Sequence, residues 1–229
     1  MLFRSSIQPL EQISKLANFH NILFHTDAVQ AIGKIPLSLK SLEVDFLTFS
    51  GHKVYAPKGS GVLYAKDEEH LHSLLHGGGH ERNLRAGTEN ISAMAGLAAA
   101  LSAIATDKDD IGMLSDYLWQ GLNSTIKNIH RNGDPKNCLP GTLNISFPGV
   151  DAEALAMNLD LAGIAVSIGS ACSTGSKEPS GVLSAMGLEK EHLTSSLRLS
   201  LGLPTTVSEL DIVIETLRPL VKKLRRLPT

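Results

Sequence analysis

Two short apolar segments, each running into polar residues, constrain the fold of this 229-residue chain more than any other feature. Residues 22–25 lead into the polar run 26–30, and residues 44–49 lead into Ser-Gly-His-Lys at 50–53. Apolar strands whose carboxyl ends carry polar residues are typical of α/β sheets, in which ligands bind beyond those ends. The pattern therefore predicts an α/β fold with a candidate site at one edge of its sheet.

A change of pattern at residues 107–110, the most polar short run, predicts two domains. We expect residues 1–106 to form part of a large α/β domain and residues 107–229 to form a smaller α+β domain. Asn90 is expected to cap a buried helix over 91–105. The other expected elements are helices at 7–19, 111–129, 151–161 and 207–227, and strands at 61–65, 141–147 and 197–201.

Composition excludes several classes of protein. Hydrophobic residues make up 42% of the chain and charged residues 19%, as in globular rather than disordered proteins. A formal charge of -2 gives no sign of a nucleic-acid partner. The longest uncharged apolar run, 91–105, is shorter than the ~20 residues that span a bilayer. Two cysteines cannot build a disulfide framework, so we expect a cytoplasmic protein with neither nucleic-acid nor membrane partners.

Lys53, at the end of the second apolar segment, is the first residue that could carry chemistry. Most lysines are solvated surface charges, and from position alone that interpretation stays open. Burial, however, makes a lysine amine easier to deprotonate, and a neutral amine can form a Schiff base. Asp27 lies at the equivalent end of the first segment, where a carboxylate could keep a pyridinium nitrogen protonated. Gln30 could donate to the ring hydroxyl, although Asp27 taken alone is equally compatible with a helix cap.

Cys172 and Arg198 are the candidates in the second half of the chain. Cys172 lies among small residues at 169–176, which suits an exposed loop from which a thiolate could attack; a buried structural thiol is the alternative. Cys138 has no comparable neighbours, and we expect it to be structural. Arg198 alternates with leucines on a predicted strand, so its guanidinium needs either a substrate carboxylate or an internal salt bridge.

The histidines at 70, 72, 76 and 80 have spacings that resemble those of metal ligands. His76 and His80 are four residues apart, but the three glycines at 77–79 disfavour a shared helical face. No H-E-x-x-H pattern is present. We therefore expect no metal site formed by this chain alone.

Five separated blocks together resemble the cysteine desulfurases, which are pyridoxal 5'-phosphate (PLP) enzymes of the class V aminotransferase superfamily. The blocks are HTDAVQ (25–30), FSGHKVYAPKGSGVLY (49–64), GGGHERNLRAGTEN (77–90), GSACSTGSKEPSGVL (169–183) and SLRLSLG (196–202). The cysteine-bearing block is more similar to the NifS/IscS-like branch than to the SufS-like branch. The resemblance implies a fold-type-I PLP-dependent transferase, with the C-terminal part of the large α/β domain followed by the small α+β domain.

The resemblance also implies cofactor-binding roles. Lys53 matches the lysine that forms the Schiff base with PLP. Asp27 and Gln30 match the partners of the pyridine nitrogen and the ring hydroxyl. Ser50 and His52 match residues that contact the cofactor, mainly its phosphate.

Further roles concern the substrate and the partners. Thr88 matches a phosphate contact that one subunit of a homodimer supplies to the other, and Arg198 matches the clamp for the substrate carboxylate. Cys172 matches the nucleophile that takes sulfur from L-cysteine, giving alanine and an enzyme persulfide. The resemblance implies that the persulfide passes to an iron–sulfur scaffold or another acceptor protein, where Cys172 could be a transient iron–sulfur ligand.

The chain departs from the family at its start. Family members carry a long N-terminal portion before Ile7, with a phosphate-binding loop and the residue that stacks on the pyridoxal ring. We therefore expect weakened cofactor binding by this chain alone and an unpaired sheet edge. Two alternatives stay open: another class V PLP enzyme, such as an aminotransferase or a selenocysteine lyase-like protein, and a degenerate paralogue without catalysis.

Overall fold

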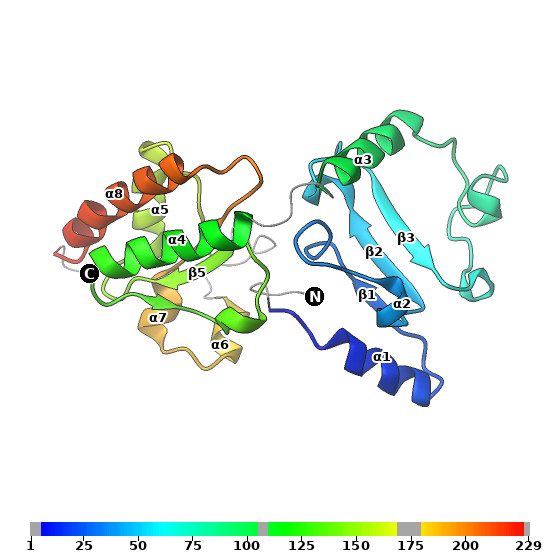
Figure 1. The fold of residues 1–229 in the computed structure, drawn as a ribbon, viewed down its shortest axis with the longest axis horizontal. Helices are drawn as coiled ribbons and strands as arrows, with labels where there is room; N and C mark the ends of the chain where they lie inside the picture. The colour runs from blue at the N-terminus through cyan, green and yellow to red at the C-terminus, as the bar shows by residue number, and fades with distance from the viewer. Residues whose placement is uncertain (1–5, 105–109, 169–179, 227–229) are drawn as a thin grey trace. The chain divides into compact units, whose positions relative to one another are not determined.

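A computed structural model describes residues 6–104, 110–168 and 180–226 of the chain. These residues divide into two compact units, shown as ribbons in Figure 1, which we call unit 1 and unit 2. Unit 1 lies within Gln8–Lys108, and unit 2 lies within Asp109–Thr229 together with Leu2–Ile7. The boundary predicted after residue 106 falls among residues 105–109, outside the described ranges. No helix within those ranges is long and apolar enough to cross a membrane.

Unit 1 contains a three-stranded sheet in the order β1-β2-β3. Its strands are β1 (His25–Asp27), β2 (Phe46–Ser50) and β3 (Gly61–Ala65). β1 runs parallel to β2, with Asp27 opposite Thr48, whereas β3 is antiparallel to β2. The parallel pair brings the carboxyl ends of the first two strands to the same edge, as the sequence pattern predicted.

The first strand starts later than the sequence pattern predicted. Residues 22–25 were expected to form it, but β1 begins at His25. Before the strand, Asp45 Oδ2 accepts a hydrogen bond from the backbone N–H of Phe24 (2.8 Å), and the Asp45 N–H donates to the Phe24 carbonyl (3.0 Å). The Phe24 carbonyl also accepts from Phe46 N (3.1 Å), at the start of the pairing between His25 and Phe46, and Asp27 is the last residue of the strand instead of following it.

Helices α1 (Leu10–Phe19), α2 (Leu39–Leu42) and α3 (Ile91–Ile104) complete unit 1, with short 3₁₀ turns between them. The predicted cap of α3 is confirmed, since Asn90 Oδ1 accepts a hydrogen bond from Ala93 N (3.0 Å). The prediction that α3 is a buried helix is wrong for this chain. Its buried side chains form a stripe along one side, and the helix lies close to Pro57 at Gly96, where a Cβ would come within 2.8 Å of the proline ring. The buried residues of α3 are Ala93, Leu97 and Ile104.

Unit 2 contains a four-stranded antiparallel sheet in the order β4-β5-β7-β6. Its strands are β4 (His130–Arg131), β5 (Thr142–Ser146), β6 (Ser167–Ile168) and β7 (Ser196–Ser200). The N-terminal Ser6 and Ile7 attach to this unit, because Ile7 N donates to Asn137 O (2.8 Å) and Ser6 pairs with Cys138. The two-residue strands β4 and β6 are too short for any sequence pattern to predict.

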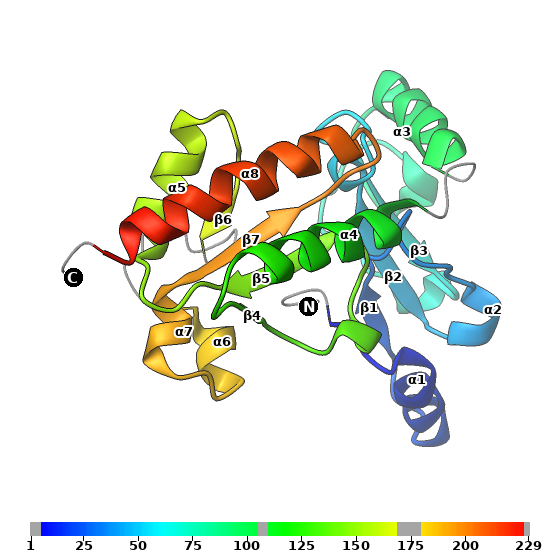
Figure 2. The same ribbon diagram turned by 60° about the vertical axis from the view of Figure 1, so that its left-hand side comes forward.

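Among the described residues of unit 2, three longer helices and two short ones accompany this sheet. They are α4 (Asp110–Thr125), α5 (Ala152–Leu161), α6 (Gly181–Ala185), α7 (Lys190–Thr194) and α8 (Val207–Leu224). Helices α4 and α8 run alongside each other over the sheet (Figure 2), and a Cβ at Gly121 of α4 would overlap Ile214 of α8. The apolar core of unit 2 is built from α4, α5, α8 and the leucine and isoleucine side chains of β5 and β7.

Alternation along β5 and β7 separates an apolar face from a polar one. Leu143 lies opposite Leu199 and Ile145 lies opposite Leu197, and all four are buried in the core. The residues between them, including Asn144 opposite Arg198, point to the other face of the sheet. The alternation of Arg198 with leucines in the sequence therefore reflects a two-faced strand.

Candidate cofactor and substrate sites

Asp27 and Lys53 follow the ends of two neighbouring parallel strands. Asp27 is the last residue of β1, and the 3₁₀ turn Gly51–Lys53 begins directly after Ser50, the last residue of β2. Because β1 and β2 are parallel and in contact, both segments leave the sheet at the same edge. The structure thus brings the candidate carboxylate and the candidate amine to one edge of unit 1.

Hydrogen bonds orient the first of these segments. Asp27 Oδ1 accepts from Val29 N (2.9 Å), and the next residue, Ala28, donates its N–H to Thr48 O (2.8 Å). Gln30 Oε1 accepts from Lys34 Nζ (3.0 Å), so the Gln30 amide NH₂ group is the part of this side chain suited to donate to a ligand. The turn after β1 therefore presents an anchored carboxylate and an amide donor.

The turn that carries His52 and Lys53 depends on Gly51. The buried Gly51 donates its N–H to Ser60 O (2.9 Å), and its carbonyl accepts from the backbone N–H groups of Val54 (2.9 Å) and Ala56 (3.0 Å). A Cβ at Gly51 would overlap Ser60 Oγ and would lie 3.2 Å from Ala56 Cβ, so any other residue here requires Ser60 to move. The side chain of Lys53 is exposed, and the described residues by themselves do not bury its amine.

Thr88 follows a strained segment of unit 1. Glu81, Arg82 and Asn83 have positive φ values of 46°, 54° and 67°, a conformation that stores about 1–3 kcal/mol per non-glycine residue. An ion pair between Arg82 Nη2 and Glu68 Oε1 (2.6 Å) ties this segment to the turn Glu68–His70. Thr88 itself is exposed. Strain of this kind concentrates at functional sites, which supports a functional role for the segment.

The structure also describes the surroundings of the histidine-rich segment. Within the described ranges, no group of three or more His, Cys, Asp or Glu side chains is arranged to hold a metal ion. Nδ1 of His80 is buried and has no hydrogen-bond partner there.

Arg198 lies in unit 2, in the middle of β7. Its Nη2 donates to Ser167 Oγ (3.1 Å), and its Nε is buried without a partner among the described residues. In the same part of the chain, no carboxylate lies within salt-bridge distance of Arg198. Of the two partners that the sequence left open, the described structure offers no internal salt bridge, and an incoming carboxylate would satisfy the buried N–H.

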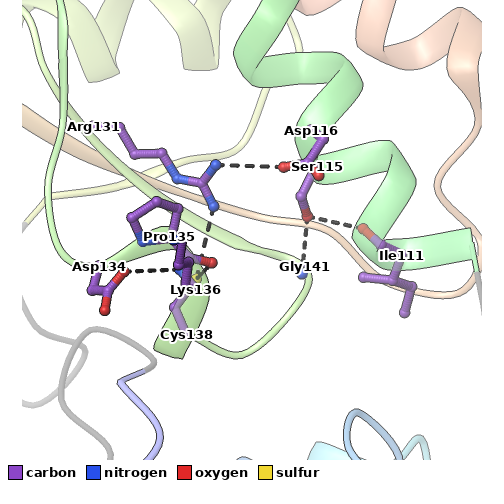
Figure 3. A network of polar contacts seen from close by, with 9 residues as sticks. All are labelled: Ile111, Ser115, Asp116, Arg131, Asp134, Pro135, Lys136, Cys138 and Gly141. Atoms are coloured by element: carbon purple, nitrogen blue, oxygen red, sulfur yellow. Dashed lines mark hydrogen bonds and ion pairs between the residues drawn. The ribbon is translucent and has the colours of Figure 1, made fainter.

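One of the two cysteines, Cys138, lies among the described residues. Cys172 belongs to residues 169–179, outside the described ranges. Cys138 is half-buried, with Sγ 3.5 Å from the carbonyl oxygen of Pro135 and 3.7 Å from Arg131 Nη2 (Figure 3). Arg131 in turn reaches Asp116 on α4 (3.5 Å). These contacts connect Cys138 to the scaffold of unit 2.

The class V aminotransferase family model matches residues 5–213, which is most of the chain. The chain belongs to the class V aminotransferase family. The cysteine desulfurase IscS of Dictyoglomus turgidum is 41% identical to this class V chain over 224 residues, covering 96% of it and 57% of the relative. The cysteine desulfurase NifS of Azotobacter vinelandii is 42% identical over 221 residues, covering 95% of the chain and 55% of the relative.

Solved structures agree with this membership. A NifS-like protein matches the class V chain with a TM-score of 0.86 at 33% identity, covering 96% of this chain and 59% of that protein. A NifS-like protein from Rickettsia africae gives a TM-score of 0.85 at 31% identity, with the same coverage. The predicted fold class, parts of a fold-type-I PLP enzyme, is confirmed. The class V chain spans a little more than half the length of the relatives it matches.

Class V aminotransferases and cysteine desulfurases are PLP-dependent, and the edge of unit 1 fits this cofactor by the chemistry of its donors. A carboxylate at Asp27 suits a protonated ring nitrogen, and the hydroxyl of Ser50 and the imidazole of His52 suit a phosphate. Lys53 provides the primary amine that an aldehyde requires. The glycine at 51, where a Cβ would overlap Ser60, lets the backbone form the tight turn that carries these side chains.

Proposed function

We propose that this chain supplies the catalytic lysine, the nucleophilic cysteine and the carboxylate clamp of a PLP-dependent cysteine desulfurase. The reaction converts L-cysteine and the thiol of Cys172 into alanine and a persulfide on Cys172. The observation that carries the proposal is the position of Asp27 and Lys53 at the ends of adjacent parallel strands. The identity of 41% to a cysteine desulfurase over nearly the whole chain supports the same reaction.

The residues of unit 1 bind and orient the cofactor in this proposal. When bound, PLP supplies an electron sink for negative charge at the α-carbon of the substrate. The Asp27 carboxylate holds the proton of the ring nitrogen, and the Gln30 amide donates to the ring hydroxyl oxygen. Ser50 and His52 donate to the phosphate. Lys53 would hold the cofactor through its amine, and the same amine would be the base for the α-proton of the substrate.

The residues of unit 2 act on the substrate. Arg198 binds the α-carboxylate of L-cysteine by donating hydrogen bonds from its guanidinium. The thiolate of Cys172 attacks the substrate sulfur, so that an S–S bond forms and the substrate C–S bond breaks. The electron pair of the broken bond is taken up as a C–H bond when the β-carbon is protonated, and alanine leaves. No external oxidant or reductant is needed, because the sulfur atom is transferred between two thiols.

We further infer a homodimer and a protein acceptor for the sulfur. Thr88 of one subunit would contact the phosphate bound by the other, which accounts for its exposure and for the strained segment before it. The persulfide would pass to an iron–sulfur scaffold or another acceptor in the cytoplasm.

The cofactor assignment is tested by incubating the chain with PLP, reducing with borohydride and locating the adduct by peptide mass spectrometry. We expect the adduct on Lys53 in excess over the exposed Lys58 in the same loop, and its loss in Lys53→Ala. Equal labelling of Lys53 and Lys58 would contradict the assignment, because it would show only the general reactivity of exposed amines.

The reaction type is tested with Cys172→Ser. This variant should keep the reduced adduct on Lys53 but release no alanine from L-cysteine. Alanine formation at the wild-type rate would instead favour another class V reaction, such as that of an aminotransferase or a selenocysteine lyase-like enzyme.

A further inference from the structure

A row of polar side chains crosses the sheet of unit 2 on the face opposite the apolar core. Asn132 follows β4, Asn144 is on β5, Arg198 is on β7 and Ser167 is on β6. Asn144 lies opposite Arg198 in one ladder, and Ser167 lies opposite Arg198 in the next. Arg198 therefore has one polar neighbour on each side, and these two neighbours differ in what they can offer to its guanidinium.

Hydrogen bonds within the sheet already occupy Asn144. Its Oδ1 accepts from Asn132 Nδ2 (2.7 Å), and its Nδ2 donates to Leu197 O (3.1 Å). Asn132 Nδ2 donates in addition to Ser146 Oγ (2.8 Å). Both ends of the Asn144 amide are thus bonded to other groups, and among the described residues no hydrogen bond joins Asn144 to the Arg198 guanidinium.

Ser167 is the neighbour that bonds to the guanidinium, with Oγ accepting from Arg198 Nη2 at 3.1 Å. Among the described residues, which stop at Ile168 in this part of the chain, β6 pairs with β7 at two positions, Ser167 with Arg198 and Ile168 with Leu197. The Ser167 hydroxyl adds a side-chain hydrogen bond to the backbone pairing between β6 and β7. A planar guanidinium held at one nitrogen loses rotational freedom about its own axis.

We propose that Ser167 is a positioning residue that turns the Arg198 guanidinium so that its buried Nε–H faces the incoming substrate carboxylate. This inference deepens the proposed desulfurase function and rests on it. Nε is buried and has no partner among the described residues, and an arginine Nε–H and a neighbouring N–H bind a carboxylate through two parallel bonds. Ser167 occupies one N–H of Nη2 and leaves the other donors for the ligand.

The test compares two ligands that differ in the carboxylate, L-alanine and ethylamine, by titration calorimetry with the PLP-loaded chain. We expect Ser167→Ala to weaken L-alanine binding about tenfold, the loss of one hydrogen bond to a charged group, and to leave ethylamine binding unchanged. In the variants Ser167→Thr and Ser167→Val, the new side chains have nearly the same shape, but only threonine carries a hydroxyl. Thr should retain the preference for alanine, and Val should lose it.

Ile168→Ala is the matched control, because it changes the neighbouring residue of β6 and should alter the affinity for neither ligand. Equal weakening of alanine and ethylamine by Ser167→Ala, or equal behaviour of the Thr and Val variants, would overturn the positioning role. If Arg198→Ala lowers alanine binding while all Ser167 variants match wild type, the inference about Ser167 is wrong and the clamp stands. If Arg198→Ala also changes nothing, both the clamp of the proposed function and the role of Ser167 are refuted.

Discussion

The two units of the chain differ in how completely they bury their apolar side chains. In unit 2, the large core residues Leu118, Phe147 and Leu197 are 0% exposed. In unit 1, Phe19 at the end of α1 is 79% exposed and Leu74 is 90% exposed. Unit 2 therefore holds a core of its own, whereas unit 1 carries its candidate site on a scaffold whose apolar surface is open. Such surfaces are usually covered by another part of the same protein or by a partner.

This difference predicts that the two units tolerate mutation differently, and the largest effect should come from the core of unit 2. Phe147→Ala should lower the free energy of unfolding by about 3–5 kcal/mol, because it removes a fully buried ring and leaves a cavity. Trp119, the one tryptophan of the chain, packs against this core, so its fluorescence during urea denaturation reports on unit 2. Leu74→Ala in unit 1 is the control and should leave this transition unchanged. If both variants lowered the free energy of unfolding by a similar amount, the two units would not differ in the way described.

The same contrast shows which parts of the fold the sequence could predict. Elements marked by their own residues were predicted well: β3 has the expected bounds Gly61–Ala65, and α3 begins after its cap at Asn90. Elements defined by tertiary contacts were not. β1 begins where His25 pairs with Phe46 of β2, and β6 is defined by the pairing of Ser167 and Ile168 with β7. Helix caps and the alternation of apolar and polar residues can be recognised in the local sequence. The residues at which a strand begins and ends depend instead on pairing with residues far along the chain.

The candidate site divides in the same way. That Asp27 and Lys53 share a sheet edge was predictable, because each follows an apolar strand in the sequence. Ser167 was missed, and the available signal was only the alternation of Val166, Ser167 and Ile168. Its bond to Arg198 joins residues 31 positions apart, and no local pattern encodes that distance.

A second prediction concerns the tight turn at the cofactor edge of unit 1. Gly51→Ala should reduce PLP labelling of Lys53 about tenfold, since the new Cβ overlaps Ser60 Oγ and displaces the turn, at a typical overpacking cost of about 1–3 kcal/mol. Ser60→Ala in the same background removes that oxygen and should restore part of the labelling. The Trp119 transition of unit 2 should not move. Full labelling in Gly51→Ala would show that the turn accommodates a side chain.

Removing one helix cap in each unit compares the stabilities of the two units with a matched pair of substitutions. Thr206 and Glu209 form a capping box at the start of α8, with Thr206 Oγ1 accepting from Glu209 N (3.3 Å), and Asn90 caps α3 in unit 1. Thr206→Ala and Asn90→Ala should each remove about 1 kcal/mol from the unit that contains the helix. If the units unfold separately, only Thr206→Ala shifts the Trp119 transition. An equal shift in both variants would indicate that the units unfold together.

The smallest expected effect is electrostatic and lies on the surface of unit 2. Tyr117 on α4 donates its hydroxyl hydrogen to Asp211 Oδ1 on α8 (2.6 Å), and this hydrogen bond to a carboxylate raises the pKa of Tyr117 above its usual 10.0. A raised pKa in the folded state means that the bond stabilises the protein at pH values below 10 and that this contribution is lost as the pH rises through the folded-state pKa. The difference in phenolate absorbance between wild type and Tyr117→Phe isolates the titration of Tyr117. Asp211→Ala removes the carboxylate and should return the pKa of Tyr117 to about 10. Titration of Tyr117 at its ordinary pH in the wild type would show that the contact between α4 and α8 does not persist in solution.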